Sequence, residues 1–154
     1  TEERSLIIIK PDAIQRSLAG EIINRFERKG LKIIGMKMMH LKEAVLAEHY
    51  AHVAGKPFYP RIERFMMSSP VIVMAVAGLK AIDAIRTIVG PTKGYEATAG
   101  TIRGDYSLSM QSNVVHASDS KENGATEIKR FFADDEIVDY DKVDTKFIFS
   151  DDLM

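Results

Sequence analysis

The chain has 154 residues, no cysteine and a formal net charge of −1. This length suits one domain with a sizeable core, and the missing cysteines exclude disulfides, thiolate metal sites and a thiol nucleophile. The charge gives no reason to expect a general nucleic-acid or membrane partner, no signal peptide is recognisable, and no apolar run is long enough to span a bilayer. We therefore expect a single cytoplasmic domain over residues 1–154.

The first part of the chain predicts a strand, a helix and a second strand. Leu6–Ile9 is a continuous aliphatic run, which is typical of a buried strand. Because Pro11 keeps Lys10 out of helical geometry, we expect the Lys10 ammonium at the strand end, within reach of a phosphate; an ordinary solvated lysine is the alternative. Residues 17–30 have the apolar spacing of a helix, and residues 31–41 predict the next strand.

A helical insert and a central strand follow. Lys42–Tyr50 and Pro60–Met67 are helical in composition and are separated by a Gly-Lys-Pro break. His49 and His52 are three residues apart on this insert and could bind a metal, although no third ligand is nearby. Val71–Ala77 is apolar at every position, which is typical of a central strand buried on both faces.

The last part of the chain predicts a helix, a long loop, a short strand, a final helix and a tail. Residues 79–89 have helical spacing, whereas residues 90–112 show little periodicity, and structureless loops of that length are usually functional or mobile. Residues 120–132 predict the final helix. Residues 134–154 mix acidic and apolar side chains, so we expect this tail to lie on its own subunit or a neighbour.

The order of these elements is βαββαβ with additions. This order favours a four-stranded sheet that is covered by helices on one face. A parallel α/β sheet of the flavodoxin type is the alternative, because strands and helices nearly alternate.

A histidine is the centre of the candidate chemistry. The run Asn113–Ser120 brings His116 from the end of a short apolar stretch into a polar turn. An ordinary imidazole near neutral pH is mostly uncharged, and its lone pair can attack an electrophile or move a proton. Asp119 and Glu122 have the spacing of a capping box, which predicts Asp119 as the cap of the final helix. The pattern alone also allows a packed or capping histidine.

An arginine upstream suggests what the histidine attacks. Arg103, in the run Thr101–Asp105, could bring a guanidinium that grips phosphate oxygens in pairs. A nucleophile beside anion-binding groups suggests phosphoryl transfer. Neither common phosphate-binding glycine motif is present, so side chains must hold most of the phosphates.

Three separated motifs resemble those of the nucleoside diphosphate kinase family. They are Ile9–Asp12, Thr101–Asp105 and Asn113–Ser120, and the resemblance runs almost end to end. It implies an α+β, ferredoxin-like fold with a four-stranded antiparallel sheet, a helical insert and a C-terminal extension. It also implies an enzyme that moves the γ-phosphate of a nucleoside triphosphate to a nucleoside diphosphate through a phosphohistidine, in two half-reactions, and so maintains NTP and dNTP pools.

The resemblance also implies a role for each site residue. His116 would be the nucleophile, with Glu127 and Ser118 orienting its imidazole and Tyr50 beside it. Mg²⁺ would arrive bridging the nucleotide phosphates, with no metal site made by the protein alone. The implied nucleotide contacts are Lys10, Arg86, Thr92 and Arg103 for the phosphates, Asn113 for the sugar region, and Phe58, Ile62 and Met110 for the base.

Two residues depart from the usual pattern of this family. Ala117 stands where many members have glycine, which adds a methyl group beside His116. Gly94 replaces a proline that is common in a surface loop, and glycine is the more mobile residue. The resemblance implies a homo-oligomer, with a hexamer favoured, and a tetramer or dimer is the alternative because that loop often contributes to subunit contacts in the family.

Other functions fit the sequence less well. A ferredoxin-like domain that binds nucleotides without transferring phosphate has no physical need for Lys10, Arg103, His116 and Glu127 together. Nucleic-acid binding is disfavoured because no basic stripe with interleaved aromatics is present. A protein-histidine kinase role cannot be separated from nucleotide exchange by sequence.

Overall fold

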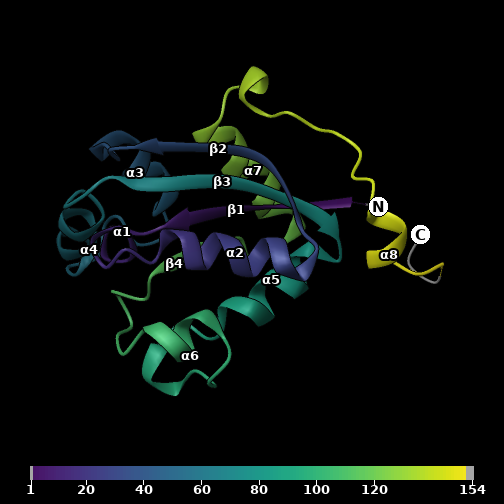
Figure 1. Cartoon of the computed structure of the whole chain (residues 1–154). Coiled ribbons are helices and arrows are strands. Elements are labelled where there is room, and N and C mark those ends of the chain that lie inside the picture. Colours follow the sequence, from purple (N-terminus) through teal and green to yellow (C-terminus); the bar gives the residue numbers. More distant parts are fainter. Residues whose placement is uncertain (1, 152–154) are drawn as a thin grey trace.

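Four antiparallel strands form the sheet in the computed structural model, which describes residues 2–151 (Figure 1). The strands are β1 (Glu2–Ile9), β2 (Lys32–Met39), β3 (Val71–Leu79) and β4 (Val115–Ala117), in the order β2-β3-β1-β4. Every neighbouring pair is antiparallel. The predicted four-stranded antiparallel sheet is confirmed, and the parallel alternative is wrong.

One face of the sheet is covered by α2 (Ala19–Lys29) and α5 (Ala81–Val89), the two helices that connect strands in the βαββαβ order. Successive strand residues point to opposite faces, so Ile7 of β1 faces these helices. There it packs in one buried cluster with Phe26 of α2 and Ile85 of α5. Burial of these side chains stabilises this layer by the hydrophobic effect.

The opposite face is covered by α3 (Glu43–His49), α4 (Tyr59–Met66) and α7 (Lys121–Phe131). Ile8 of β1 belongs to this second cluster, together with Leu46 of α3. Figure 1 shows α2 and α7 on opposite sides of the sheet. The prediction of helices on one face was therefore wrong, because the central strands are apolar on both faces and both must be buried.

Short helices occupy places where the sequence predicted extended chain or loop. They are α1 (Pro11–Gln15) and α6 (Ile102–Tyr106), with one-turn 3₁₀ segments η1 (Gly94–Glu96) and η2 (Asp134–Glu136). Lys10 itself is extended, with φ −73° and ψ 165°, as predicted, but Pro11 then begins α1. Five residues are too few to show helical periodicity. No helix within residues 2–151 has the length and apolar character needed to cross a membrane.

The final helix α7 begins at a different cap from the predicted one. Ser120 is the capping residue, and its hydroxyl accepts a hydrogen bond from the Asn123 amide at 3.0 Å. The Asp119 carboxylate instead accepts from the Asn123 side chain at 2.6 Å. The predicted capping box of Asp119 and Glu122 is wrong, because Ser120 is the last extended residue before the helix and so is the one placed to cap it.

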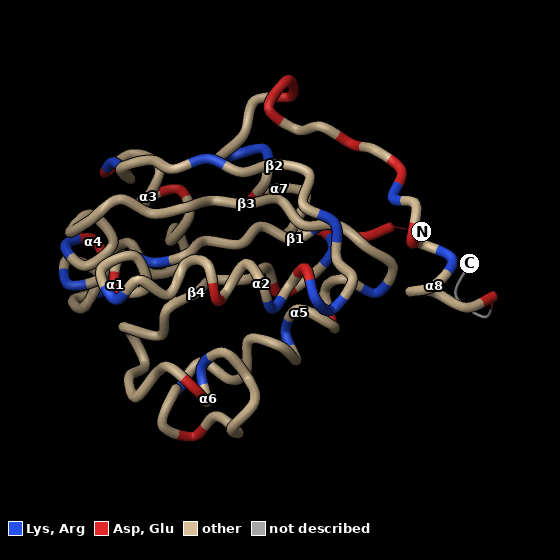
Figure 2. Tube along the Cα trace, in the orientation of Figure 1, with Lys and Arg blue, Asp and Glu red and all other residues tan. Residues whose placement is uncertain are grey.

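The C-terminal segment runs along the free edge of β2 and ends in α8 (Thr145–Ile148). The Val138 amide donates to the Ile34 carbonyl at 2.8 Å, and Lys32 pairs with Asp139 at 2.7 Å. Figure 2 shows acidic positions along this segment and basic positions on β2. The tail therefore lies on its own subunit as far as residue 151, which is one of the two predicted placements, and residues 152–154 of the predicted tail lie outside the described residues.

Candidate active site

A cavity of about 1020 Å³ lies at the end of the sheet where β1 and β4 carry Lys10 and His116. Every residue predicted for the site lines it except Ser118, which is fully buried behind Glu127. The lining includes Lys10, Tyr50, Phe58, Ile62, Arg86, Thr92, Arg103, Met110, Asn113, His116 and Glu127. The fold thus brings together side chains from α4, α5, α6, α7 and β4 and from the segments between the elements.

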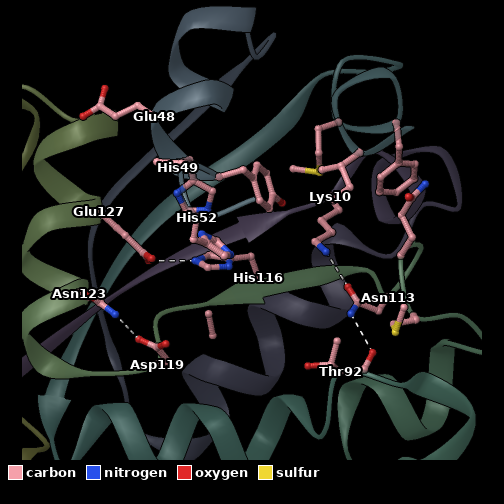
Figure 3. Close-up of a pocket in the computed structure, with 18 of the residues that line it drawn as sticks. Lys10, Glu48, His49, His52, Thr92, Asn113, His116, Asp119, Asn123 and Glu127 are labelled. Carbon is pink, nitrogen blue, oxygen red and sulfur yellow. Dashed lines mark hydrogen bonds and ion pairs between the residues drawn. The ribbon is translucent and has the colours of Figure 1, made fainter. Parts of the chain in front are cut away.

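The imidazole of His116 is fixed by a carboxylate (Figure 3). His116 Nε2 lies 2.9 Å from Glu127 Oε1, which also accepts a hydrogen bond from Ser118 Oγ at 2.7 Å. Burial acts to raise the pKa of Glu127, but the hydrogen bonds from His116 and Ser118 and the charge of His116 lower it overall. The ionised carboxylate makes Nε2 the protonated nitrogen. No residue within 2–151 hydrogen-bonds to Nδ1, which is left with its lone pair.

A second histidine, which the sequence prediction did not assign to the site, packs against the first. The ring of His49 meets that of His116 edge-on, with centroids 4.8 Å apart, and Tyr50 contacts His49 in turn at 5.0 Å. Arg130 Nη1 donates to His49 Nδ1 at 2.9 Å. Burial, followed by the charge on His116, lowers the pKa of His49. The sequence held one sign of this arrangement: Arg130 follows Glu127 by three residues and therefore lies on the same face of α7.

Donor atoms of His49, His116 and Glu127 lie within 4.8 Å of one another. Zinc bound at about 2.0–2.2 Å in a tetrahedron needs donors closer together than that, and the Arg130 guanidinium on His49 would repel a cation. We interpret this group as two packed histidine rings, each hydrogen-bonded to a side chain of α7. His52, three residues after His49, is not part of it.

Lys10, Asn113 and Thr92 form a chain of hydrogen bonds across the cavity (Figure 3). Lys10 Nζ donates to Asn113 Oδ1 at 2.7 Å, and Asn113 Nδ2 donates to the Thr92 carbonyl at 2.9 Å. Burial, followed by the positive charge of Arg103, lowers the pKa of Lys10 to about 8. The ammonium is therefore a poorly solvated cation beside the lone pair of His116, where an anionic ligand would stabilise it.

Arg103 is held differently from the prediction. Its Nε, Nη1 and Nη2 donate to the carbonyls of Asn113, Gly90 and Val115 at 3.2, 3.0 and 2.6 Å. Since a guanidinium has five N–H donors, three are used on the backbone and two remain for a ligand. Burial, then the charge of Arg86, lowers the pKa of Arg103 to about 10. Arg103 both braces the loop before β4 and presents charge to the cavity.

Apolar side chains stand at the mouth of the cavity. Phe58 at the start of α4 is 41% exposed, and Met110 is 56% exposed in the loop before β4. Ile62 of α4 is partly buried against the second core cluster. Large apolar groups left in water beside a polar cavity mark a surface that a flat apolar ligand can cover.

The two departures from the family pattern have different surroundings from those expected. Ala117 neighbours His116 on β4, so its side chain points to the opposite face, where it packs in the cluster with Ile7. The added methyl group is therefore not beside the imidazole.

Gly94 is buried, its amide donates to the Ser109 carbonyl at 3.0 Å, and a Cβ there would collide with Ser107. Gly94 is thus held in the loop by a backbone hydrogen bond and by close packing against Ser107.

Comparisons with known proteins agree on one family. A family model described as nucleoside diphosphate kinase matches residues 3–137. A nucleoside diphosphate kinase of Parabacteroides distasonis is 51% identical over 150 residues, 97% of this chain and 98% of the relative. That of Staphylothermus marinus is 54% identical over 138 residues, 90% of this chain and 98% of the relative. Among solved structures, a halophilic nucleoside diphosphate kinase from Halobacterium salinarum in complex with CDP has a TM-score of 0.94 at 39% identity, covering 97% of this chain and 100% of that chain.

Proposed function

The chain belongs to the nucleoside diphosphate kinase family, and we propose that His116 is the residue that carries the phosphoryl group. The enzyme is a phosphotransferase that moves the γ-phosphate of a nucleoside triphosphate to a nucleoside diphosphate. One observation carries the assignment of His116: Glu127 holds Nε2 at 2.9 Å, so Nδ1 keeps its lone pair at the wall of the cavity. An adjacent group that fixes the tautomer is what activates a histidine nucleophile.

In the first half-reaction, the Nδ1 lone pair attacks the γ-phosphorus. The N–P bond forms while the bond between the γ-phosphorus and the bridging oxygen breaks, and the nucleoside diphosphate leaves with that electron pair. The imidazole becomes cationic, and Glu127, whose pKa is lowered by its bonds to His116 and Ser118, stabilises the charge. The second half-reaction is the reverse, with a different nucleoside diphosphate as acceptor.

The cations of the cavity would stabilise the phosphoryl group during transfer. We assign Lys10 and Arg103 to its oxygens and Arg86 and Thr92 to the neighbouring phosphates, because these residues line the same cavity as His116. Fixed donors act where charge develops without reorganising. Loss of one such donor typically costs about 10²–10³ in rate.

Asn113 would contact the sugar, and Phe58, Ile62 and Met110 would hold the base. A base that stacks on these apolar side chains is recognised by its ring face, which every nucleobase has. This supports the use of both purine and pyrimidine nucleotides. The Halobacterium salinarum relative, whose structure is of a complex with CDP, is consistent with a pyrimidine substrate. Tyr50 would pack beside the site through His49.

Mg²⁺ would bind together with the nucleotide phosphates. The donor set fits, because Mg²⁺ uses one or two carboxylates plus substrate phosphates and water, and Asp119 is an exposed carboxylate on the cavity lining. Glu127 is committed to His116. When bound, Mg²⁺ supplies positive charge to the phosphate oxygens.

The assembly is proposed to be a homo-oligomer, with a hexamer favoured by the family resemblance. Large apolar side chains are exposed on three separate segments, with Met38 60%, Leu108 88% and Phe147 80% exposed. Such groups are covered when copies associate. Light scattering on the purified protein would give the mass of the assembly.

The single domain over residues 1–154 and the cytoplasmic location are further predictions from the sequence.

The central experiment is intact-protein mass after a brief incubation with ATP and Mg²⁺, kept alkaline because phosphohistidine is lost in acid. The expected result is a gain of one phosphoryl group that GDP removes and that His116→Ala lacks. His52→Ala is a matched control, because His52 is another histidine on the cavity lining, to which no role is assigned. Turnover with the label on a residue other than His116 would disprove the assignment.

A further inference from the structure

Val114, two residues before His116, has a backbone conformation that is rare for its type. Its φ is +65°, in the left-handed region, which a β-branched side chain enters only against steric resistance. The amide of Val115 donates to the Asn113 carbonyl at 2.8 Å, which closes a tight three-residue turn around Val114. Strained turns of this kind persist only where the surroundings hold them, and they cluster at functional sites.

Both backbone polar groups of Val114 are hydrogen-bonded to the segment that follows β1. Its amide donates to Asp12 Oδ2 at 3.1 Å, and its carbonyl accepts from the Lys10 amide at 2.9 Å. Its side chain is fully buried in the core cluster that contains Ile9. Among residues 2–151, Asp12 thus supplies the one side-chain hydrogen bond to the backbone of Val114 itself, while Arg103 donates to the carbonyls of Asn113 and Val115 on either side.

The turn determines where the cations of the site stand. Asn113, its first residue, accepts from Lys10 Nζ through its side chain and from Arg103 Nε through its carbonyl. A shift of the turn would therefore move Asn113 relative to both cations and to His116. Asp12 itself does not line the cavity.

We propose that Asp12 is a positioning residue for phosphoryl transfer: its carboxylate holds Val114 in the strained turn and so fixes Asn113, Lys10 and Arg103 against the transferred phosphate. This inference depends on the proposed role of His116. It differs from a purely structural role because the contact acts on the geometry of the phosphate site.

The charge of Asp12 also acts on Lys10. Two charged groups act on the Lys10 ammonium, Arg103 from α6 and Asp12 from α1, and Lys10 in turn helps to lower the pKa of His49 from α3. Burial and Arg103 lower the pKa of Lys10 to about 8, and Asp12 acts against them. Burial raises the pKa of Asp12 itself, and Lys10 and the Val114 amide oppose that rise. Loss of the carboxylate charge would lower the pKa of Lys10 further.

Two substitutions separate the hydrogen bond from the charge. Asp12→Asn keeps an oxygen that can accept from the Val114 amide but removes the charge, whereas Asp12→Ala removes both. We expect Asp12→Ala to lose about 10²-fold in the rate of His116 phosphorylation, since small misplacements at this range have that effect. We expect Asp12→Asn to recover most of the rate near neutral pH, with the alkaline limb of kcat/KM moved to lower pH.

A control substitution removes a carboxylate that lies away from the cavity. Asp139 of the tail pairs with Lys32 of β2 and accepts from the Tyr140 amide. Asp139→Asn should match the wild type in rate. Wild-type protein that takes no label on His116 would show that the proposed function has failed. If the wild type is labelled on His116 but Asp12→Ala is phosphorylated at the same rate, the positioning role of Asp12 is overturned while the proposed function stands. The same holds if Asp12→Ala and Asp12→Asn lose the same factor in rate.

Amide hydrogen exchange gives a test that does not depend on Asp12→Ala folding. In the wild-type protein the Val114 amide should exchange slowly, and in Asp12→Asn it should remain protected because an acceptor is still present. Exchange of the wild-type Val114 amide as fast as that of an unbonded amide would overturn the proposal, whatever the variants do.

Discussion

Glu127 reaches His116 from one turn before the end of α7, and its Oε1 receives both His116 Nε2 at 2.9 Å and Ser118 Oγ at 2.7 Å. Ser118 is in turn fixed to β1, because its hydroxyl accepts from the Leu6 amide at 2.9 Å. The imidazole is therefore oriented by a helix and by the sheet at once. This double attachment determines which ring nitrogen of His116 is free.

Glu127→Gln should slow phosphorylation of His116. The amide keeps the shape of the carboxylate but not its charge, so it stabilises the imidazolium less well. A hydrogen bond to a charged group is worth about 1.5–3 kcal/mol, which corresponds to roughly 10- to 10²-fold in rate. Stopped-flow or quenched measurement of the half-reaction would test this. Glu122→Gln, an exposed change on the same helix, should leave the rate unaltered; similar losses in both variants would argue against the assignment.

Activity should fall at alkaline pH as Lys10 loses its proton. Burial lowers the pKa of Lys10 from its ordinary value to about 8. The charged form is the one that binds phosphate, so kcat/KM should decline as pH rises through that value. Lys10→Arg keeps a charge over the whole range and should remove this limb while lowering the maximum. An unchanged alkaline limb in Lys10→Arg would mean that another group causes it.

Arg130→Met should destabilise the fold near the site. It leaves Nδ1 of the buried His49 without its donor, and an unsatisfied buried acceptor costs about 1–3 kcal/mol. For a domain of this size that corresponds to a fall in Tm of about 2–4 °C per kcal/mol. Thermal unfolding would measure it, with Lys129→Met on the exposed side of α7 as control. Equal Tm values for the two variants would contradict the importance of this contact.

Gly94→Ala should also destabilise, although the residue lies in a loop. A Cβ at Gly94 would collide with the side chain and carbonyl of Ser107, whereas a Cβ at Gly55 would meet nothing within 4 Å. Overpacking of this kind costs about 1–3 kcal/mol. Chemical denaturation of Gly94→Ala and Gly55→Ala would compare the two sites, and a neutral effect at Gly94 would show that the loop can move away.

Long periodic or uniformly apolar segments were predictable from the sequence because their signal is local. Val71–Leu79, the observed β3, is apolar along its length, and that pattern is required of a strand buried on both faces. The motifs around Lys10, Arg103 and His116 likewise identified the residues that line the cavity. Short elements were missed: α6 has five residues and a Thr101 cap, too little for a periodic signal.

The sequence by itself determined the order of the elements and which side chains could perform the chemistry, since both depend on residue types and near-neighbour spacing. Only the tertiary structure decided how those side chains are held. Lys10 meets Asn113 across 103 positions of the chain, and Arg130 meets His49 across 81. The tertiary structure also decided that Arg103 uses three of its donors on backbone carbonyls and that the Ala117 side chain packs into the core. Contacts between distant segments exist only after the sheet has formed, and no local pattern specifies them.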